Sequence, residues 1–125
     1  MTTLFIEGTE DTPEINFDGN TLQFTISGRS LPEDVTSFYQ PVTSWLDVFE
    51  LNENQKGCFH FKLEYFNTAS SKVILDILMK IEEIVNDKQS NLSVKWHHQE
   101  SDEDMLEAGE EYKELVSVPF EIVSY

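Results

Sequence analysis

Three hydroxyl side chains stand close together near the middle of the chain, between a strand-like segment and a long helix-like segment. They are Thr68, Ser70 and Ser71. The start of a helix has free backbone N–H groups and a partial positive charge, which favour an anionic group there. A hydroxyl at this place can cap the helix, or it can accept a phosphate and become a switch. Judged by residue type alone, Thr68 is a cap or turn residue, because caps are common and phosphorylation sites are rare.

The neighbours of Thr68 have simpler expected roles. We expect Ser70 or Ser71 to cap the helix by accepting hydrogen bonds from N–H groups of its first turn. Asn67 is expected to shape the turn through its side-chain hydrogen bonds.

A second group of chemically versatile side chains consists of Cys58, His60 and His97, which can share one polar face of a sheet. Thiols and imidazoles bind zinc, but the chain has no CxxC or HxxxH spacing. We therefore interpret these residues as ordinary sheet residues and predict neither a metal site nor a cofactor. The acidic run at 102–104 lacks the EF-hand loop pattern and is interpreted as a solvated helix start. No glycine-rich phosphate loop or nucleophile elbow is found, so we predict that the protein is not an enzyme.

Size and charge limit the class of protein. The 125 residues suit one domain, 1–125, with a real hydrophobic core. Eight basic residues against 24 acidic ones give a net charge of -16, which argues against binding to nucleic acid or to an anionic membrane surface. One cysteine excludes an intrachain disulfide. The chain start does not resemble a signal peptide and no segment has the roughly 20 apolar residues of a membrane span, so we expect a cytoplasmic protein.

The elements that would position these residues follow from hydrophobic periodicity. The central strand is predicted to point Phe59, Phe61, Leu63 and Tyr65 to one side and its alternate residues to the other. A turn at 18–20 predicts a hairpin. Strands are predicted near residues 4–6, 15–17, 22–26, 57–65, 92–96 and 119–123.

Three helices are predicted between the strands. The first has an apolar face, and it tolerates Pro41 only if that residue lies in the first turn. We expect it to end around residues 52–54. The second follows the Thr68 turn for about four turns, with Asp76 and Lys80 as an i,i+4 ion pair. The third occupies the later part of the acidic segment 100–114. The predicted inward residues of the first helix are Phe38, Val42, Trp45, Leu46 and Phe49, those of the second are Val73, Ile74, Ile77, Leu78, Ile81, Ile84 and Val85, and those of the third are Met105, Leu106, Tyr112 and Leu115.

The strands share a pattern that predicts the architecture. Each has one apolar and one polar face, whereas a sheet covered on both sides would show continuous apolar runs. The fold class is therefore predicted to be a two-layer α/β sandwich, a mixed sheet with helices packed mainly on one face. Residues 58–97 read as strand, helix, strand with parallel strands. The polar face is predicted to carry Gln23, Thr25, His60, Lys62, Glu64, Lys95 and His97.

Several segments together resemble the SiaC family of regulatory phosphoproteins. They are residues 6–15, residues 30–33, the core 65–70 with its Asn67-Thr68 turn, and Val94-Lys95-Trp96 followed by an acidic helix. The Asn67-Thr68 turn between strand and helix is the most specific of them. The order and spacing of these segments extend over nearly the whole chain. Ala69 stands where the family often has serine, which removes one hydroxyl but leaves Thr68.

The resemblance implies a STAS-like fold, similar to anti-sigma-factor antagonists, and a bacterial partner-switch function. It implies that Thr68 is phosphorylated by a dedicated Ser/Thr kinase and dephosphorylated by a PPM-type phosphatase. It also implies that the unphosphorylated form binds and activates an output protein such as a diguanylate cyclase, in cyclic di-GMP signalling that controls biofilm formation. The partner-binding residues are expected around Thr68: Tyr65, Phe66, Asn67, Ala69, Ser70, Ser71 and Lys72.

Two alternatives stay open at this point. The domain can be a constitutive STAS-like module that binds a protein or a small ligand without phosphorylation. It can also be a small hydrolase or metal-dependent enzyme that uses the polar sheet face. A test for phosphorylation of Thr68 distinguishes the switch from the constitutive module. Metal analysis of the purified protein tests the enzyme alternative.

Overall fold

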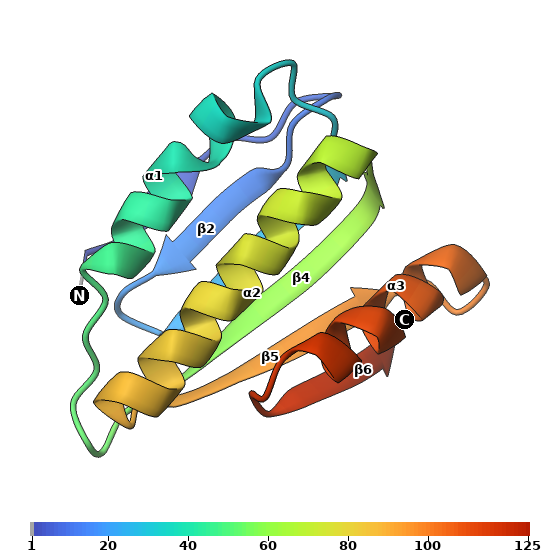
Figure 1. The fold of residues 1–125 in the computed structure, drawn as a ribbon. Helices are drawn as coiled ribbons and strands as arrows, with labels where there is room; N and C mark the ends of the chain where they lie inside the picture. Colours follow the sequence, from blue (N-terminus) through green and yellow to red (C-terminus); the bar gives the residue numbers. More distant parts are fainter. Residues whose placement is uncertain (1) are drawn as a thin grey trace.

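A computed structural model describes residues 2–125 as one six-stranded sheet and three helices (Figure 1). The elements follow the order β-β-β-α-β-α-β-α-β. The strands are β1 (Leu4–Ile6), β2 (Glu14–Asp18), β3 (Gln23–Ser30), β4 (Lys56–Phe66), β5 (Asn91–His98) and β6 (Phe120–Ser124), and the helices are α1 (Val35–Asp47), α2 (Thr68–Lys88) and α3 (Glu103–Leu115).

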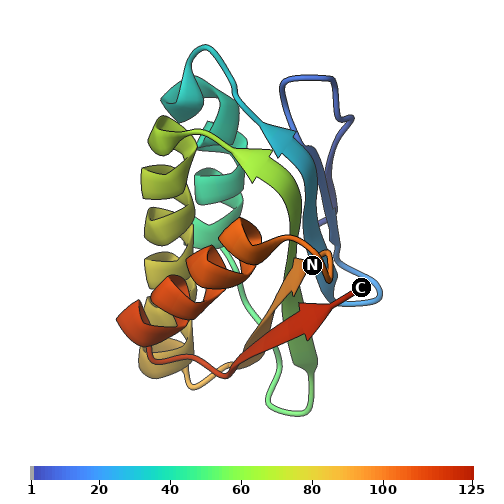
Figure 2. The same ribbon diagram turned by 90° about the vertical axis from the view of Figure 1, so that its right-hand side faces the viewer.

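The sheet is mixed, and its spatial order is the same as its sequence order, β1-β2-β3-β4-β5-β6. The pairs β1·β2 and β2·β3 are antiparallel, and the pairs from β3 to β6 are parallel. All three helices cover one side of the sheet, and the other side is open (Figure 2). The predicted two-layer α/β arrangement, the hairpin at 18–20 and the parallel strands across 58–97 are confirmed.

A β-bulge near the end of β4 overturns the prediction for Tyr65. Leu63 pairs with Gly28, but Arg29 pairs with Tyr65, so Glu64 is an extra residue in the ladder. A bulge of this kind places two successive residues on the same side and reverses the alternation after it. Tyr65 therefore lies on the open side of the sheet and is 47 % exposed, and Phe66 takes the inward position.

Helix α1 differs from its prediction in two ways. Pro41 lies inside the helix rather than in its first turn, on the exposed side. An interior proline costs roughly 3 kcal/mol relative to alanine, and burial of Tyr39, Val42, Trp45 and Leu46 against the sheet offsets this cost. The helix also ends at Asp47, before the predicted residues 52–54. Phe49 lies in the segment that follows the helix and is buried there. Its agreement with the helical periodicity was therefore coincidental.

The other helices also correct the sequence analysis. Helix α2 has 21 residues, longer than the predicted four turns. Lys80 does not pair with Asp76; its ammonium lies 2.7 Å from the Asp47 carboxylate of α1. Helix α3 begins at Glu103, which confirms the helix start expected at 102–104 and extends the helix beyond the later part of the segment 100–114. Leu115, predicted to face inward, is 61 % exposed because α3 ends there. Val116 and Val118 are buried in its place.

Aromatic side chains form much of the core between the two layers. Trp45 packs against Phe17 and Phe24, and Trp96 stacks on Phe61. Both tryptophans are buried, which confirms the inward position predicted for Trp45. Helix α2 is amphipathic, with charged residues along its outer side, and no helix among residues 2–125 could span a bilayer.

Candidate functional site at the start of helix α2

One residue, Asn67, joins the end of β4 to the start of α2. Its backbone N–H donates to the carbonyl oxygen of Ser30 over 3.1 Å, and its side-chain Oδ1 accepts the N–H of Ser70 over 2.9 Å. Asn67 is thus the residue that caps the helix. The prediction that Ser70 or Ser71 caps α2 is wrong, because both lie within the first turn. The turn-shaping side-chain bond predicted for Asn67 is confirmed.

Thr68 is the first residue of α2, and its side chain is exposed. Within residues 2–125, the hydrogen bonds found leave the Thr68 hydroxyl unused. Ala69 is exposed beside it, and Lys72 is exposed four residues later. Residues four apart lie on the same helix face, so the Lys72 ammonium lies within reach of a group attached to Thr68.

Ser70 faces the opposite way, into the interior, with no exposed surface. Its Oγ donates to the carbonyl oxygen of Ser30 (3.0 Å) and accepts from Ser30 Oγ (2.8 Å). Ser30 Oγ in turn lies 2.6 Å from the Tyr39 hydroxyl, which completes the chain as the donor. Burial raises the pKa of Tyr39 to about 12, against a smaller lowering by the Ser30 hydrogen bond. The neutral Tyr39 phenol therefore keeps its proton for this chain at ordinary pH.

This buried chain of hydroxyls ties the start of α2 to β3 and to α1. Ser70 was predicted to be a partner-binding residue, but a side chain without exposed surface cannot touch a partner in this conformation. Ser70 instead fixes the turn. The roles of Ser30 and Tyr39 were missed, although residues 30–33 were one of the segments that resembled the family.

Ser71 is the remaining hydroxyl of the turn, and it is half-buried. Its Oγ donates to the carbonyl oxygen of Thr68 over 2.7 Å. The Tyr112 hydroxyl of α3 donates to the Ser71 carbonyl oxygen over 2.8 Å. Burial, together with the nearby Glu111 carboxylate, raises the pKa of Tyr112, so this donor also stays protonated. The first turn of α2 is thus held from β3 on one side and from α3 on the other.

The two aromatic residues before the turn have different surroundings. Phe66 packs against Trp96 and Tyr112 and anchors the end of β4 in the core. Tyr65 is exposed, with the Arg29 guanidinium 5.5 Å from its ring centroid. Of the eight residues predicted for the site, all but Ser70 have a side chain at or partly at the surface.

The polar sheet face brings His60 and His97 together. His60 Nδ1 lies 3.0 Å from His97 Nε2, and His60 Nε2 lies 2.7 Å from Gln23 Oε1. Burial lowers the pKa of both imidazoles, with a further contribution from the Lys95 ammonium. Cys58 is buried, and its thiol donates to the carbonyl oxygen of Phe59 in the same strand. Among residues 2–125, no group of three potential metal ligands is found.

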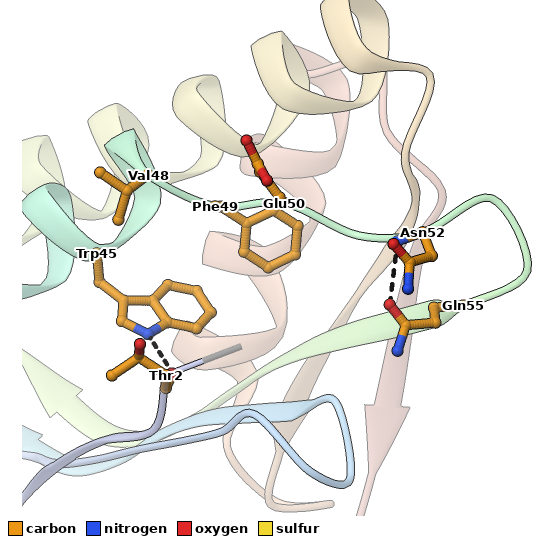
Figure 3. Close-up of a pocket in the computed structure, with 7 residues that line it drawn as sticks. All are labelled: Thr2, Trp45, Val48, Phe49, Glu50, Asn52 and Gln55. Carbon is orange, nitrogen blue, oxygen red and sulfur yellow. Dashed lines mark hydrogen bonds between the residues drawn. The ribbon is translucent and has the colours of Figure 1, made fainter.

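A pocket of about 340 Å³ lies far from this site, beside the C-terminal end of α1 (Figure 3). Trp45 lines it and donates from Nε1 to the carbonyl oxygen of Thr2 over 2.8 Å. Glu50, Asn52 and Gln55 form the rest of its polar lining. The start of α2 lies at the other end of the helix layer (Figure 1), so this pocket has no connection to Thr68.

Comparison with known proteins agrees with the fold. Residues 6–125 match the family described as SiaC family regulatory phosphoprotein. The class of protein is therefore a regulatory protein rather than an enzyme, as the sequence predicted. The chain belongs to the SiaC family.

Relatives and solved structures cover the full length of the chain. An uncharacterized protein of Pseudomonas aeruginosa (strain UCBPP-PA14) is 31% identical over 125 residues, which is 100% of this chain and 98% of that protein. The crystal structure of the diguanylate cyclase SiaD in complex with its activator SiaC from Pseudomonas aeruginosa matches with a TM-score of 0.88 and 31% identity, over 98% of this chain and 99% of that chain. Apo-SiaC from the same organism matches with a TM-score of 0.84, 31% identity and the same coverage.

Proposed function

We propose that this chain is a phosphorylation-controlled regulator of a diguanylate cyclase, and that Thr68 carries the phosphate. The observation that supports this most is the exposed, unbonded Thr68 hydroxyl at the first position of α2. Ser70 is buried, and Ser71 already donates to a backbone carbonyl. The structure of a related SiaC with the cyclase SiaD supports the choice of output partner.

The first turn of α2 suits a switch because its support is rigid. A phosphate adds about -1.5 to -2 charges and three acceptor oxygens. The helix N-terminus and Lys72 can accommodate these charges. The hydroxyl chain beneath the turn does not involve Thr68. Phosphorylation therefore changes the surface that a partner meets without refolding the domain.

The proposed cycle has three partners. A Ser/Thr kinase adds the phosphate, and a PPM-type phosphatase removes it. The unphosphorylated surface formed by Tyr65, Phe66, Asn67, Ala69, Ser71 and Lys72 binds and activates the cyclase. The phosphate displaces the cyclase by bulk and charge, which lowers cyclic di-GMP production and with it biofilm formation.

The test combines mass spectrometry with cyclase assays. The chain is incubated with the kinase and ATP, and the modified residue is mapped. Phosphate is expected on Thr68, none on Thr68→Ala, and an unchanged amount on Ser71→Ala. Thr68→Glu is expected to bind and activate the cyclase at least tenfold more weakly than the unmodified chain. Phosphate at another residue, or equal cyclase activation by Thr68→Glu, contradicts the proposal. Cyclase binding without any phosphorylation across growth conditions favours the constitutive binding module.

A further inference from the structure

The open side of the sheet, which no helix covers, has a composition unlike the rest of the surface. We define the open face as the outward side chains of β1–β6. It carries Phe5 (57 % exposed), Tyr65 (47 %) and Tyr125 (46 %), the last just beyond β6. Among the large apolar side chains that are exposed within residues 2–125, these are all of the aromatic ones. Tyr65 lies near the end of β4 and Tyr125 follows β6, whereas Phe5 lies on β1 at the opposite edge of the sheet. Exposed aromatic residues of this kind are typical of protein interfaces.

The part of the open face formed by β3–β6 has a positive balance of charge, opposite to that of the chain, whereas β2 adds Glu14 and Asp18 to the face. Strands β3–β6 contain two acidic residues, Glu64 and Glu121, and four of the eight basic residues of the chain. Strand alternation and the β4 bulge place these side chains outward. The chain as a whole has 24 acidic residues and a net charge of -16. The four basic residues are Arg29, Lys56, Lys62 and Lys95.

Several of these groups are held in place before any partner arrives. The Lys62 ammonium lies 4.5 Å from the ring centroid of Tyr125, as Arg29 lies over Tyr65. On the same face, His60 forms hydrogen bonds with His97 and with Gln23. Cations over aromatic rings and bonded imidazoles lose less conformational freedom on binding than free side chains do. The open face is therefore a preorganised surface.

The size of the face matches that of an interface. At about 4.8 Å between strands and about 3.3 Å per residue, the six strands cover roughly 600 Å². A standard protein–protein interface buries about 800 Å² on each partner. The sheet alone thus provides about three quarters of the area that one partner buries in a standard interface.

We propose that the open face docks an acidic segment of a partner protein. Aspartate and glutamate side chains of the segment pair with Arg29, Lys62 and Lys95, and its apolar groups pack on Tyr65 and Tyr125. A second copy of this chain is a poor occupant, because a symmetric sheet-to-sheet dimer would bring like charges together. This surface does not include the Thr68 hydroxyl, although it shares Tyr65 with the surface proposed to bind the cyclase, and the proposal does not depend on phosphorylation.

The test is an NMR titration of the ¹⁵N-labelled full chain with a ten-residue poly-glutamate peptide. Saturable amide shifts are expected in β4 and β5, around His60, Lys62, Lys95 and His97. The affinity should fall at least tenfold in Lys62→Glu/Lys95→Glu. It should stay within twofold in Lys88→Glu/Lys113→Glu, which changes the charge equally at two exposed helix lysines. Circular dichroism checks that both variants fold.

Three results would overturn the proposal. One is the absence of saturable shifts on the open face. Another is an equal loss of affinity in the two double variants, which would mean that the peptide responds only to net charge. The third is the same set of shifts with sulfate at equal charge concentration, which would assign the face to small anions instead of a protein segment.

Discussion

Helices α2 and α3 begin with the same kind of cap, but the start of α3 is acidic and the start of α2 is neutral. In both, the capping side chain accepts the N–H three residues on: Asn67 from Ser70 at 2.9 Å, and Asp102 from Met105 at 3.0 Å. The start of α3 has three successive carboxylates, at residues 102–104. The start of α2 has a neutral cap and no acidic residue in its first turn. The positive end of the α3 dipole is therefore already compensated, whereas that of α2 can accept an added negative charge.

The third residue of each helix shows a second difference. Ser70 and Met105 hold equivalent positions, and both are buried. The Met105 side chain is held by apolar packing, and its carbonyl oxygen accepts from Trp96 Nε1 over 2.9 Å. Ser70 is held by the hydroxyl chain from Tyr39 through Ser30. The start of α2 is therefore the more strictly positioned of the two, since hydrogen bonds require a defined geometry and a methionine adapts its shape.

The largest expected effect on stability comes from removal of the Ser70 hydroxyl. Ser70→Ala leaves the buried Ser30 hydroxyl without its acceptor and should lower the free energy of unfolding by about 2 kcal/mol. Met105→Leu at the equivalent position should cost less than about 1.5 kcal/mol. Urea unfolding of the purified variants measures both. Ser71→Ala is the matched control and should stay within about 0.5 kcal/mol. Equal losses for Ser70→Ala and Ser71→Ala would contradict the role given to the buried chain.

A phosphate on Thr68 should have a smaller, stabilising effect on the domain itself. The helix dipole favours the added charge by about 0.3–1 kcal/mol at low salt. Asn67→Asp gives α2 a charged cap like that of α3, so the gain from phosphate should disappear in this variant. The measurement compares thermal unfolding of the phosphorylated and unmodified forms in 20 mM and 500 mM salt. An equal gain in wild type and Asn67→Asp would mean that the neutral cap is irrelevant to the phosphate.

The smallest expected effect is a difference in acid sensitivity between helix starts. Asp34 caps α1, and hydrogen bonds from the Ser37 N–H, and secondarily from its hydroxyl, hold the pKa of Asp34 below its ordinary value of 3.8. Since the folded pKa is the lower one, the cap stabilises α1 above about pH 4 and is lost as the pH falls through the folded pKa. NMR should show the Ser37 amide shifting with acid while the Ser70 amide stays constant. The shift should vanish in Asp34→Asn; if it persists, another group is titrating.

The sequence predicted the layers of this fold well because periodicity reports burial directly. The apolar alternation in β3, β4 and β5 and the apolar stripe of α2 show in the local sequence which side of each element is buried in the fold. The wrong predictions lie where one extra residue reverses the alternation of a strand, or where a contact with a distant element determines the position of a side chain. A single bulge at Glu64 reversed Tyr65 and Phe66. Lys80 paired with α1 instead of its own helix, which no local spacing could reveal.

The candidate site was predictable only in part for the same reason. The exposed Thr68 and the turn-forming Asn67 follow from local chemistry and from the resemblance. The distinction between Ser70 and Ser71 depends on Ser30 and Tyr39, which are 40 and 31 positions away from Ser70 in the sequence. Hydroxyl residues look alike in a sequence whether they face solvent or a buried partner. The cap prediction failed because it treated the turn as an isolated segment.

The order of the strands has a consequence for how the protein folds. Each strand pairs with its neighbour in sequence, so the sheet can grow one strand at a time from β1 to β6. Tyr39, Ser30 and Asn67 all precede Ser70, so the support of the Thr68 turn is complete before β5, α3 and β6 are synthesised. Only the Tyr112 bond to Ser71 arrives later. The antiparallel pairs β1·β2 and β2·β3 close short loops, whereas each parallel pair from β3 to β6 closes a longer crossover that contains a helix and is expected to form more slowly. Domains can begin to fold during synthesis.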